Sequence, residues 1–125
     1  MKIEEVEKFI KASCRLDNLY DDFKELSKKY GDKVVSKYSI KNVNDVIGEC
    51  NDLLKSMQNL HEDIKNIDED ELPTNIDILI MLNQIRAKIE GIRVLNIRHA
   101  SGRWEWLVDG GKKVLYTHPP KSIKK

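Results

Sequence analysis

Residues 9–30 read FIKASCRLDNLYDDFKELSKKY, and this stretch indicates how the chain folds. Its apolar side chains recur at alternating intervals of three and four residues: Phe9, Ala12, Leu16, Leu19, Phe23, Leu26 and Tyr30. That spacing places all of them on one side of an α-helix, as in the seam of a coiled coil. Gly31 follows as a helix stop. The pattern predicts an amphipathic helix over about residues 3–30.

A second stretch with this spacing lies between Asn42 and the acidic run at residues 68–71. Its apolar side chains are Val43, Val46, Cys50, Leu53, Met57, Leu60, Ile64 and Ile67. Asn42 is a favourable N-cap, whereas four adjacent carboxylates oppose the macrodipole at a helix C-terminus. We therefore predict a second helix over about residues 42–67.

The third helix is predicted to begin after Thr74, because Asp77 three residues later completes a pattern that resembles a capping box. Its seam consists of Ile78, Leu82, Ile85, Ile89 and Ile92. Leu95 continues this heptad, so we favour a helix over about residues 75–97 that runs through Gly91. The alternative is a stop at Gly91, which would make residues 92–98 a strand.

The character of the chain changes after Ser101-Gly102. Residues 103–108 (RWEWLV) and 112–117 (KKVLYT) are rich in aromatic and β-branched side chains and flank Asp109-Gly110-Gly111. Such a pair of segments around an Asp-Gly turn predicts a β-hairpin. Strand alternation places Trp104, Trp106 and Val108 on one face. The hairpin is expected over residues 99–120, followed by a basic tail at residues 121–125.

These elements predict a mainly α fold, in which residues 1–98 form a three-helix bundle or antiparallel coiled coil with a C-terminal β-hairpin. An isolated hairpin is marginally stable in water, so one face must pack on the bundle, pair with a second chain or await a ligand. A helix of about 27 residues is about 40 Å long. This length is unusual in a compact chain of 125 residues, and we therefore favour a homodimer.

Composition excludes several classes of protein. The 125 residues correspond to one domain, and 34% of them are charged, which is typical of long helices with wide solvated faces. No apolar run is long enough to span a bilayer, and the acidic N-terminus is unlike a secretory signal. Cys14 and Cys50 form neither a CxxC pair nor a disulfide framework. A cytoplasmic protein with reduced thiols is expected.

Charge is distributed unevenly along the chain. Residues 93–125 carry a balance of +6, although the whole chain is +1. Phosphate backbones attract such a cationic segment, and aromatic rings between the cations can stack on bases. We therefore predict a contact with nucleic acid, either DNA or RNA, or with a nucleoprotein complex. The candidate residues are Arg98, Arg103, Trp104, Trp106, Lys112, Lys113, Tyr116 and Lys121.

Two alternatives stay open at this point. The tryptophans can instead anchor the hairpin to the bundle, with the lysines on its solvated side. The protein can also act by docking on a larger protein, as do small inhibitor proteins of viruses and mobile elements that act on host complexes. The hairpin edge, the acidic loop at residues 68–71 or a helical face would then be the contact.

We find no motif that indicates an enzyme. The histidines lack metal-ligand spacing, and there is no glycine-rich phosphate loop or nucleophile elbow, so no metal, cofactor or small-molecule substrate is predicted. Arg93 and His99 have the spacing of the catalytic pair in the HEPN ribonucleases. However, Val94 stands where that family carries a polar residue, so we do not assign the chain to it. A HEPN-like ribonuclease is the third hypothesis.

Overall fold

The computed structural model describes residues 1–57, 63–109 and 114–123, and it confirms a mainly α fold with a C-terminal antiparallel sheet. Along the chain these residues form α1 (Ile3–Tyr30), α2 (Lys37–Met57), the 3-10 turn η1 (Glu69–Glu71), α3 (Asn75–Val94), β1 (Ile97–Ala100), β2 (Arg103–Trp106) and β3 (Tyr116–Thr117). None of the helices is long and apolar enough to cross a bilayer within these described ranges.

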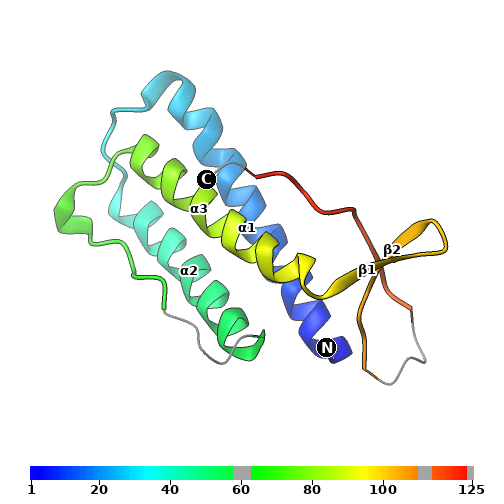
Figure 1. The fold of residues 1–125 in the computed structure, drawn as a ribbon. Coiled ribbons are helices and arrows are strands. Elements are labelled where there is room, and N and C mark those ends of the chain that lie inside the picture. Colours follow the sequence, from blue (N-terminus) through cyan, green and yellow to red (C-terminus); the bar gives the residue numbers. More distant parts are fainter. Residues whose placement is uncertain (58–62, 110–113, 124–125) are drawn as a thin grey trace.

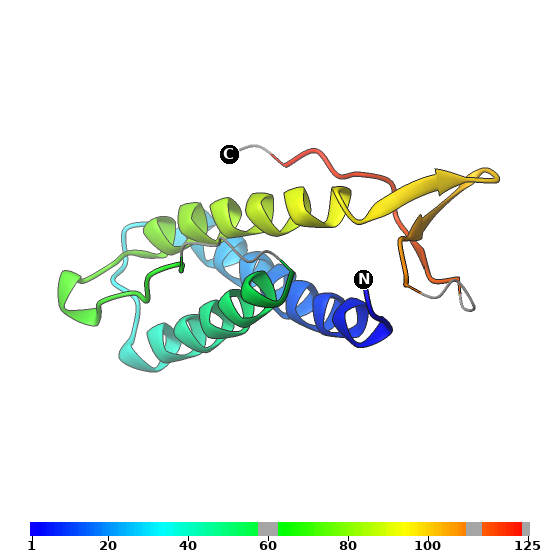
Figure 2. The ribbon, with the colours of Figure 1, turned by 60° about the horizontal axis from the view of Figure 1, so that its bottom comes forward.

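Helix α1 is the centre of the bundle. It packs against both α2 and α3, which make little contact with each other, and it runs in the opposite direction to both (Figures 1 and 2). The predicted seam is buried from Phe9 to Phe23, as burial of an apolar stripe requires. Leu26 and Tyr30, which the spacing assigned to the same seam, are 45% and 55% exposed. Beside them lies the first turn of α3, where Asn75 Nδ2 donates to Tyr30 O at 2.8 Å.

Helix α2 begins and ends earlier than predicted. It starts at Lys37, five residues before the expected position, because Ser36 accepts a hydrogen bond from the Ser39 N–H at 3.2 Å and so caps the first turn. It ends at Met57, so the prediction of a helix to residue 67 was wrong. Leu60, which the prediction placed on this seam, lies outside the described residues.

Residues 63–67 are bound to α2 as a non-helical segment by two asparagine side chains. Asn51 accepts from the Ile64 N–H at 2.8 Å and donates to Ile64 O at 2.9 Å. Asn44 makes the same pair of bonds with Ile67, at 2.7 and 3.1 Å. These four bonds satisfy backbone groups that a helix would otherwise have paired internally, which explains why an apolar helical spacing here gives no helix.

Helix α3 begins as predicted and ends three residues early. The Thr74 hydroxyl accepts from the Asp77 N–H, and the Asp77 carboxylate accepts from the Thr74 N–H, which together form a capping box. The helix runs through Gly91 but ends at Val94 rather than residue 97. Ile97 belongs to β1 instead, where it pairs with Trp106 and becomes buried.

The sheet has three antiparallel strands in the order β1-β2-β3. Its tight turn lies at Ser101-Gly102, where both residues have positive φ angles of 53° and 77°, the conformation that suits a two-residue hairpin. The predicted pairing of β2 with the following segment is present, with Trp104 opposite Thr117. The predicted turn at Asp109-Gly110-Gly111 lies largely outside the described residues, and β1 is a strand that the prediction missed.

Candidate nucleic-acid interface

One face of the sheet is directed to solvent and carries half of the described candidate residues. Side chains opposite each other in an antiparallel pair share a face, and successive residues alternate. Arg98 is opposite Glu105, which in turn is opposite Tyr116, and Arg103 lies two residues before Glu105. We call these four residues, Arg98, Arg103, Glu105 and Tyr116, the outer face. The fold therefore brings together three of the eight predicted contact residues.

The outer face combines cations with an exposed aromatic ring. The Arg103 guanidinium lies 5.0 Å from the centre of the Tyr116 ring, and Tyr116 is 59% exposed. The Arg98 guanidinium is bonded to a Glu105 carboxylate oxygen at 2.7 Å, yet the Arg98 side chain remains 63% exposed. The Glu105 side chain is only 12% exposed, so Arg98 is the accessible member of this ion pair and Glu105 its more buried partner.

The opposite, inner face holds the two tryptophans against the bundle. Trp106 is 4% exposed, and its ring meets Phe9 of α1 edge-on with the ring centroids 5.1 Å apart. Trp104 is half-buried, and its ring lies 5.3 Å from that of His99. Trp106 is therefore part of the core, and its ring is not accessible to a base. The alternative in which tryptophan anchors the hairpin is the correct one for this residue.

The lysines of the predicted set are placed differently. Lys121 lies beyond the sheet, where its ammonium is 3.9 Å from an Asp17 carboxylate oxygen of α1. It lines a hollow of about 300 Å³ together with His118 and Tyr116 of the outer face. Lys112 and Lys113 lie outside the described residues. The hollow thus connects a cation of the C-terminal segment with the exposed aromatic ring.

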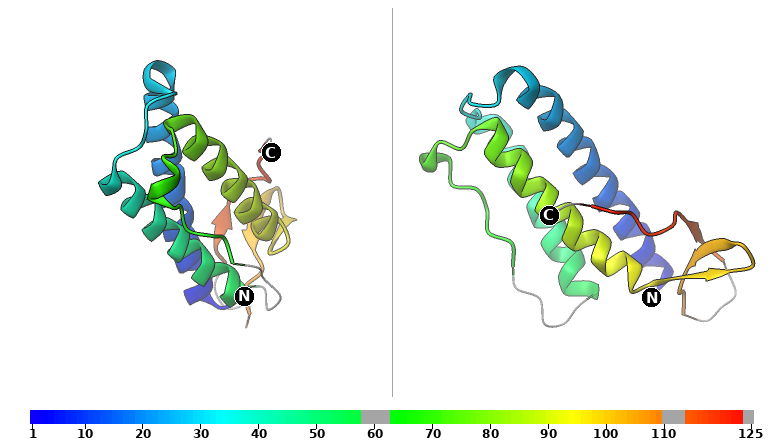
Figure 3. Two further views of the ribbon diagram at one scale, coloured as in Figure 1. Left: turned by 90° about the vertical axis from the view of Figure 1, so that its left-hand side faces the viewer. Right: turned by 45° about the horizontal axis from the view of Figure 1, so that its top comes forward.

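A buried ion pair that the sequence analysis missed holds the C-terminal segment in place. Arg93 is 4% exposed and binds the Glu90 carboxylate through two nitrogens, Nε and Nη2, each at 2.7 Å. Its remaining donors bond the Thr117 hydroxyl at 2.9 Å and the carbonyl oxygens of His118 and Pro119 at 2.9 and 2.8 Å. We call the Arg93–Glu90 pair the clamp, because it ties residues 117–121 to α3. Figure 3 shows the backbone of the C-terminal segment, in red, leading from the sheet back along the helices.

The Glu90 carboxylate of the clamp has a hydrogen-bond donor in addition to Arg93. The Lys121 N–H donates to Glu90 Oε2 at 2.8 Å, which adds a third hydrogen bond to this carboxylate. Burial alone would raise the pKa of Glu90, but the hydrogen bonds from Arg93 and the Lys121 backbone hold it below its usual value. An acidic and a basic residue three positions apart on a helix is the signal that could have indicated the pair. Its tertiary partners have no sequence signature.

The clamp also bears on the ribonuclease hypothesis. All five N–H donors of Arg93 are engaged within the protein, so Arg93 cannot bind a phosphate unless the C-terminal segment is released. His99 lies on the inner face of the sheet, against Trp104. Arg93 is therefore buried and fully bonded, whereas His99 is exposed beside Trp104, so the two residues do not share one open site.

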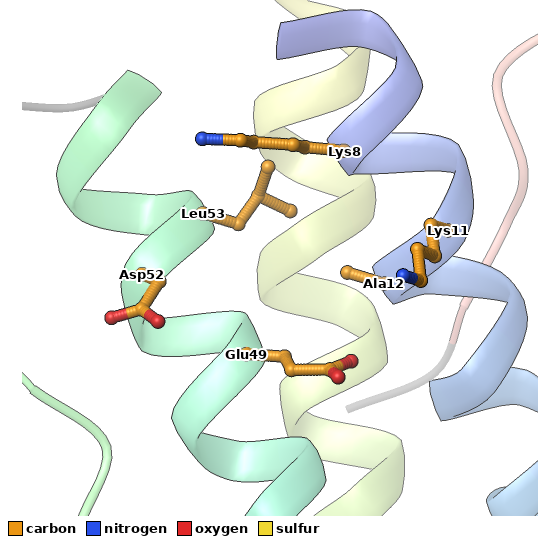
Figure 4. A pocket seen from close by; sticks show the side chains of 6 residues that line it. All are labelled: Lys8, Lys11, Ala12, Glu49, Asp52 and Leu53. Carbon is orange, nitrogen blue, oxygen red and sulfur yellow. The ribbon is translucent and has the colours of Figure 1, made fainter. Parts of the chain in front are cut away.

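A separate surface groove lies between α1 and α2, with a volume of about 230 Å³ (Figure 4). Lys8 and Lys11 of α1 stand on one side and Glu49 and Asp52 of α2 on the other, while the small side chain of Ala12 leaves the space open. Glu49 also pairs with Arg15 at the same helix interface. The Arg15–Glu49 ion pair is thus a charge contact that joins α1 to α2.

Among the described residues, no cluster of three or more metal-binding side chains is present. No family model, curated protein or solved structure matches this chain. The class of protein that the fold defines is thus a small helical bundle with a docked C-terminal sheet, and function must be argued from its surfaces.

Proposed function

We propose that this protein binds nucleic acid through the outer face of its C-terminal sheet. The observation that carries the proposal is the presence of Arg98, Arg103 and Tyr116 on one exposed face of a rigidly docked sheet. Guanidinium groups bind phosphate in a bidentate manner, and an exposed tyrosine ring can stack on a base. Contacts of this kind favour recognition of the backbone over readout of sequence.

Glu105 has a specific role in this proposal. Its carboxylate binds Arg98 in the free protein and therefore competes with phosphate for that guanidinium. We expect Glu105→Gln to strengthen binding, because it removes the competing charge and keeps the side-chain volume. The same substitution on a surface without nucleic-acid contacts would have no effect on binding.

The test is fluorescence anisotropy of labelled duplex DNA, single-stranded DNA and RNA, titrated with the full chain over a salt series. Arg103→Gln should weaken binding and reduce the slope of log affinity against log salt by about one. Tyr116→Ala should cost about 1–3 kcal/mol for a stacked base. Lys29→Gln, which removes one positive charge from the last turn of α1, is the matched control and should leave affinity nearly unchanged.

Point variants are better suited to this test than removal of residues 99–125. Such a truncation would also remove Trp106 from the core and the segment that the clamp holds. If the full chain binds none of the three probes at low salt, the proposal fails. Equal weakening by Arg103→Gln and Lys29→Gln would indicate non-specific attraction to the whole surface and would also overturn it.

The alternative function is docking on another protein, as inhibitor proteins of viruses and mobile elements dock on host complexes. The observation that favours it is a set of exposed apolar side chains on the helices, such as Ile80 of α3 at 56% and Tyr38 of α2 at 84% exposure. A stoichiometric protein partner that survives nuclease treatment in a pull-down would support this function over nucleic-acid binding.

A further inference from the structure

Helix α3 carries an apolar face directed away from the bundle. At 3.6 residues per turn, Ile76, Ile80, Asn83, Ala87, Gly91 and Val94 share one side of the helix, opposite the buried seam. We call this side the outward face. Ile76, Ile80 and Val94 are 40%, 56% and 39% exposed. An amphipathic surface helix has polar residues in this position, so the outward face of α3 is unusual.

The charges of α3 are directed elsewhere. Every residue of this helix is described, and its five charged residues are Asp77, Arg86, Lys88, Glu90 and Arg93. Arg86 pairs with Asp17 of α1 and also donates from Nη1 to Asn83 Oδ1 at 3.2 Å, at the edge of the outward face. Glu90 and Arg93 form the clamp. Asp77 and Lys88 lie along one flank of the outward face. By contrast, the solvent side of α1 is densely charged. The apolar character of the outward face is therefore a property of α3 and not of the chain in general.

Gly91 gives a second reason to expect a partner at this face. Glycine within a helix costs about 1 kcal/mol relative to alanine. Gly91 is exposed, and a Cβ atom built at this position would meet nothing within 4 Å. The folded chain by itself therefore offers no packing reason for a glycine here. A second helix that approaches closely would supply one.

We propose that two copies of this chain associate through the outward faces of α3, packed antiparallel about a two-fold axis near Asn83 and Gln84. The face is complementary to itself in size, because its large residues lie in the N-terminal half and its small ones in the C-terminal half. In this arrangement Ile80 packs on the partner subunit's Ala87. One side of Ile76 lies against Gly31 of its own chain, and its exposed side packs on the partner subunit's Gly91, where the missing side chain leaves room.

Charge supports the same arrangement. A two-fold axis perpendicular to both helices brings like flanks together, so Asp77 lies beside the partner subunit's Lys88, and this pairing occurs twice. The arrangement also extends the apolar contact at both ends. Leu95, which is 73% exposed, lies beside the partner subunit's Leu72, which is 63% exposed.

The size of the face sets the expected strength. A helix of 20 residues is about 30 Å long and about 10 Å wide, so one helix face alone lies at the small end of the range for specific interfaces. We therefore expect a dimer with a micromolar dissociation constant. This inference stands independently of nucleic-acid binding by the sheet.

Sedimentation equilibrium of the full chain, from about 1 to 500 μM, tests the association in the range expected for a micromolar constant. The wild type should change from a 14.5 kDa monomer to a dimer. Ile80→Glu should raise the dissociation constant about 100-fold or more, since each dimer buries the introduced charge twice. Tyr38→Glu, at an 84% exposed apolar residue on α2, is the control and should leave the dimer intact.

Disulfide cross-linking tests the antiparallel geometry. Cys14→Ser removes the exposed native thiol, while burial raises the pKa of Cys50 to about 12 and leaves that thiol unreactive at neutral pH. In this background, Ile80→Cys mixed with Ala87→Cys should form a covalent heterodimer, and neither variant alone should cross-link. Positions 80 and 87 are about 10 Å apart along one helix, so a single chain cannot form the bond.

Three results would overturn the proposal. The first is a monomer at every concentration, which would leave the outward face to a different protein. The second is a dimer that Ile80→Glu does not weaken, which would place the interface elsewhere. The third is efficient cross-linking of Ile80→Cys with itself, which would indicate parallel helices.

Discussion

The helical bundle and the C-terminal segment are held in different ways. The bundle is stabilised by a continuous apolar seam in which each side chain contributes through the area that it buries, without strict geometry. The described residues of the C-terminal segment, 97–109 and 114–121, are held at a few specific points instead. Trp106 meets Phe9, the clamp binds residues 117–121, and the Asp109 N–H donates to Met1 O at 2.7 Å. A short sheet thus becomes part of the domain through a small number of directional contacts.

This difference matters for the proposed function. The contacts at the inner face and at the clamp engage Trp106 and Arg93 within the protein. Tryptophan and arginine are both common in nucleic-acid interfaces. The same contacts orient the sheet and leave its outer face free to present Arg103 and Tyr116. The inner face of the sheet therefore attaches it to the bundle, while the outer face remains exposed.

The largest expected effect is at the anchor. Trp106→Ala should lower the free energy of unfolding by about 3–5 kcal/mol, because it removes a buried ring and leaves a cavity against Phe9. Urea denaturation followed by circular dichroism at 222 nm measures the loss. Trp104→Ala, at the half-buried ring, is the comparison and should cost less. An unchanged midpoint for Trp106→Ala would show that the sheet is not part of the cooperative core.

The next effect is at the clamp. Arg93→Met should lower the free energy of unfolding by about 3 kcal/mol, because it leaves the Glu90 carboxylate buried without its charge partner. Hydrogen exchange at residues 115–121 should accelerate more than exchange in α1. The double variant Glu90→Leu, Arg93→Met should regain much of the stability, since no unpaired charge remains. Equal stability of the single and double variants would contradict this account.

Acid should weaken the clamp by a smaller amount, since a protonated carboxyl can still form some of the hydrogen bonds. The pKa of Glu90 is held below the ordinary value of 4.5 in the folded protein. A lowered pKa contributes stability that is fully present above pH 4.5 and is lost as pH falls through the folded value. Hydrogen exchange at residues 117–121 should therefore show a loss of protection below about pH 4.5 that Glu90→Gln abolishes. The same pH dependence in Glu90→Gln would assign the effect to another group.

The smallest expected effect is on the bundle surface. Gly91→Ala should raise the free energy of unfolding by about 0.5–1 kcal/mol at concentrations where the chain is monomeric, since alanine favours the helix and the added methyl group meets open space. Thermal unfolding at low micromolar concentration measures it. Gly31→Ala is the contrasting variant, because its Cβ would lie 2.6 Å from Ile76 Cδ1 and the Ile76 side chain would have to move, so its gain in stability should be smaller than that of Gly91→Ala.

The helices were predictable to different degrees for identifiable reasons. The bounds of α1 and the start of α3 agree with the prediction, because a long seam and the Thr74–Asp77 capping box are local signals. The predicted end of α2 was wrong because Asn44 and Asn51 bind the backbone of residues 63–67. An asparagine on a helix surface gives no sequence signal for such a partner. The strand β1 was missed because Leu95 continues the helical spacing, which favoured a helix through residue 97.

The residues of the candidate site were also predictable to different degrees. Sequence alternation correctly placed Trp104 and Trp106 on the face opposite Glu105, because the period of a strand is local. It could not say which face packs on the bundle, and so it retained Trp106 as a contact residue. The clamp joins residues that are 24 to 31 positions apart in the sequence. A local sequence pattern cannot predict contacts over such a separation.

By itself, the sequence determined the helical class of the protein, the first helix, the capped start of the third and the cationic, aromatic character of the C-terminal segment. These features follow from periodicity, capping and composition, which act over a few residues. Only the tertiary structure decided that the sheet docks through Trp106, that Arg93 is a clamp rather than a free cation, and that Arg98, Arg103 and Tyr116 share an exposed face. Those outcomes depend on which distant groups meet, and burial and hydrogen bonding between them are properties of the folded chain.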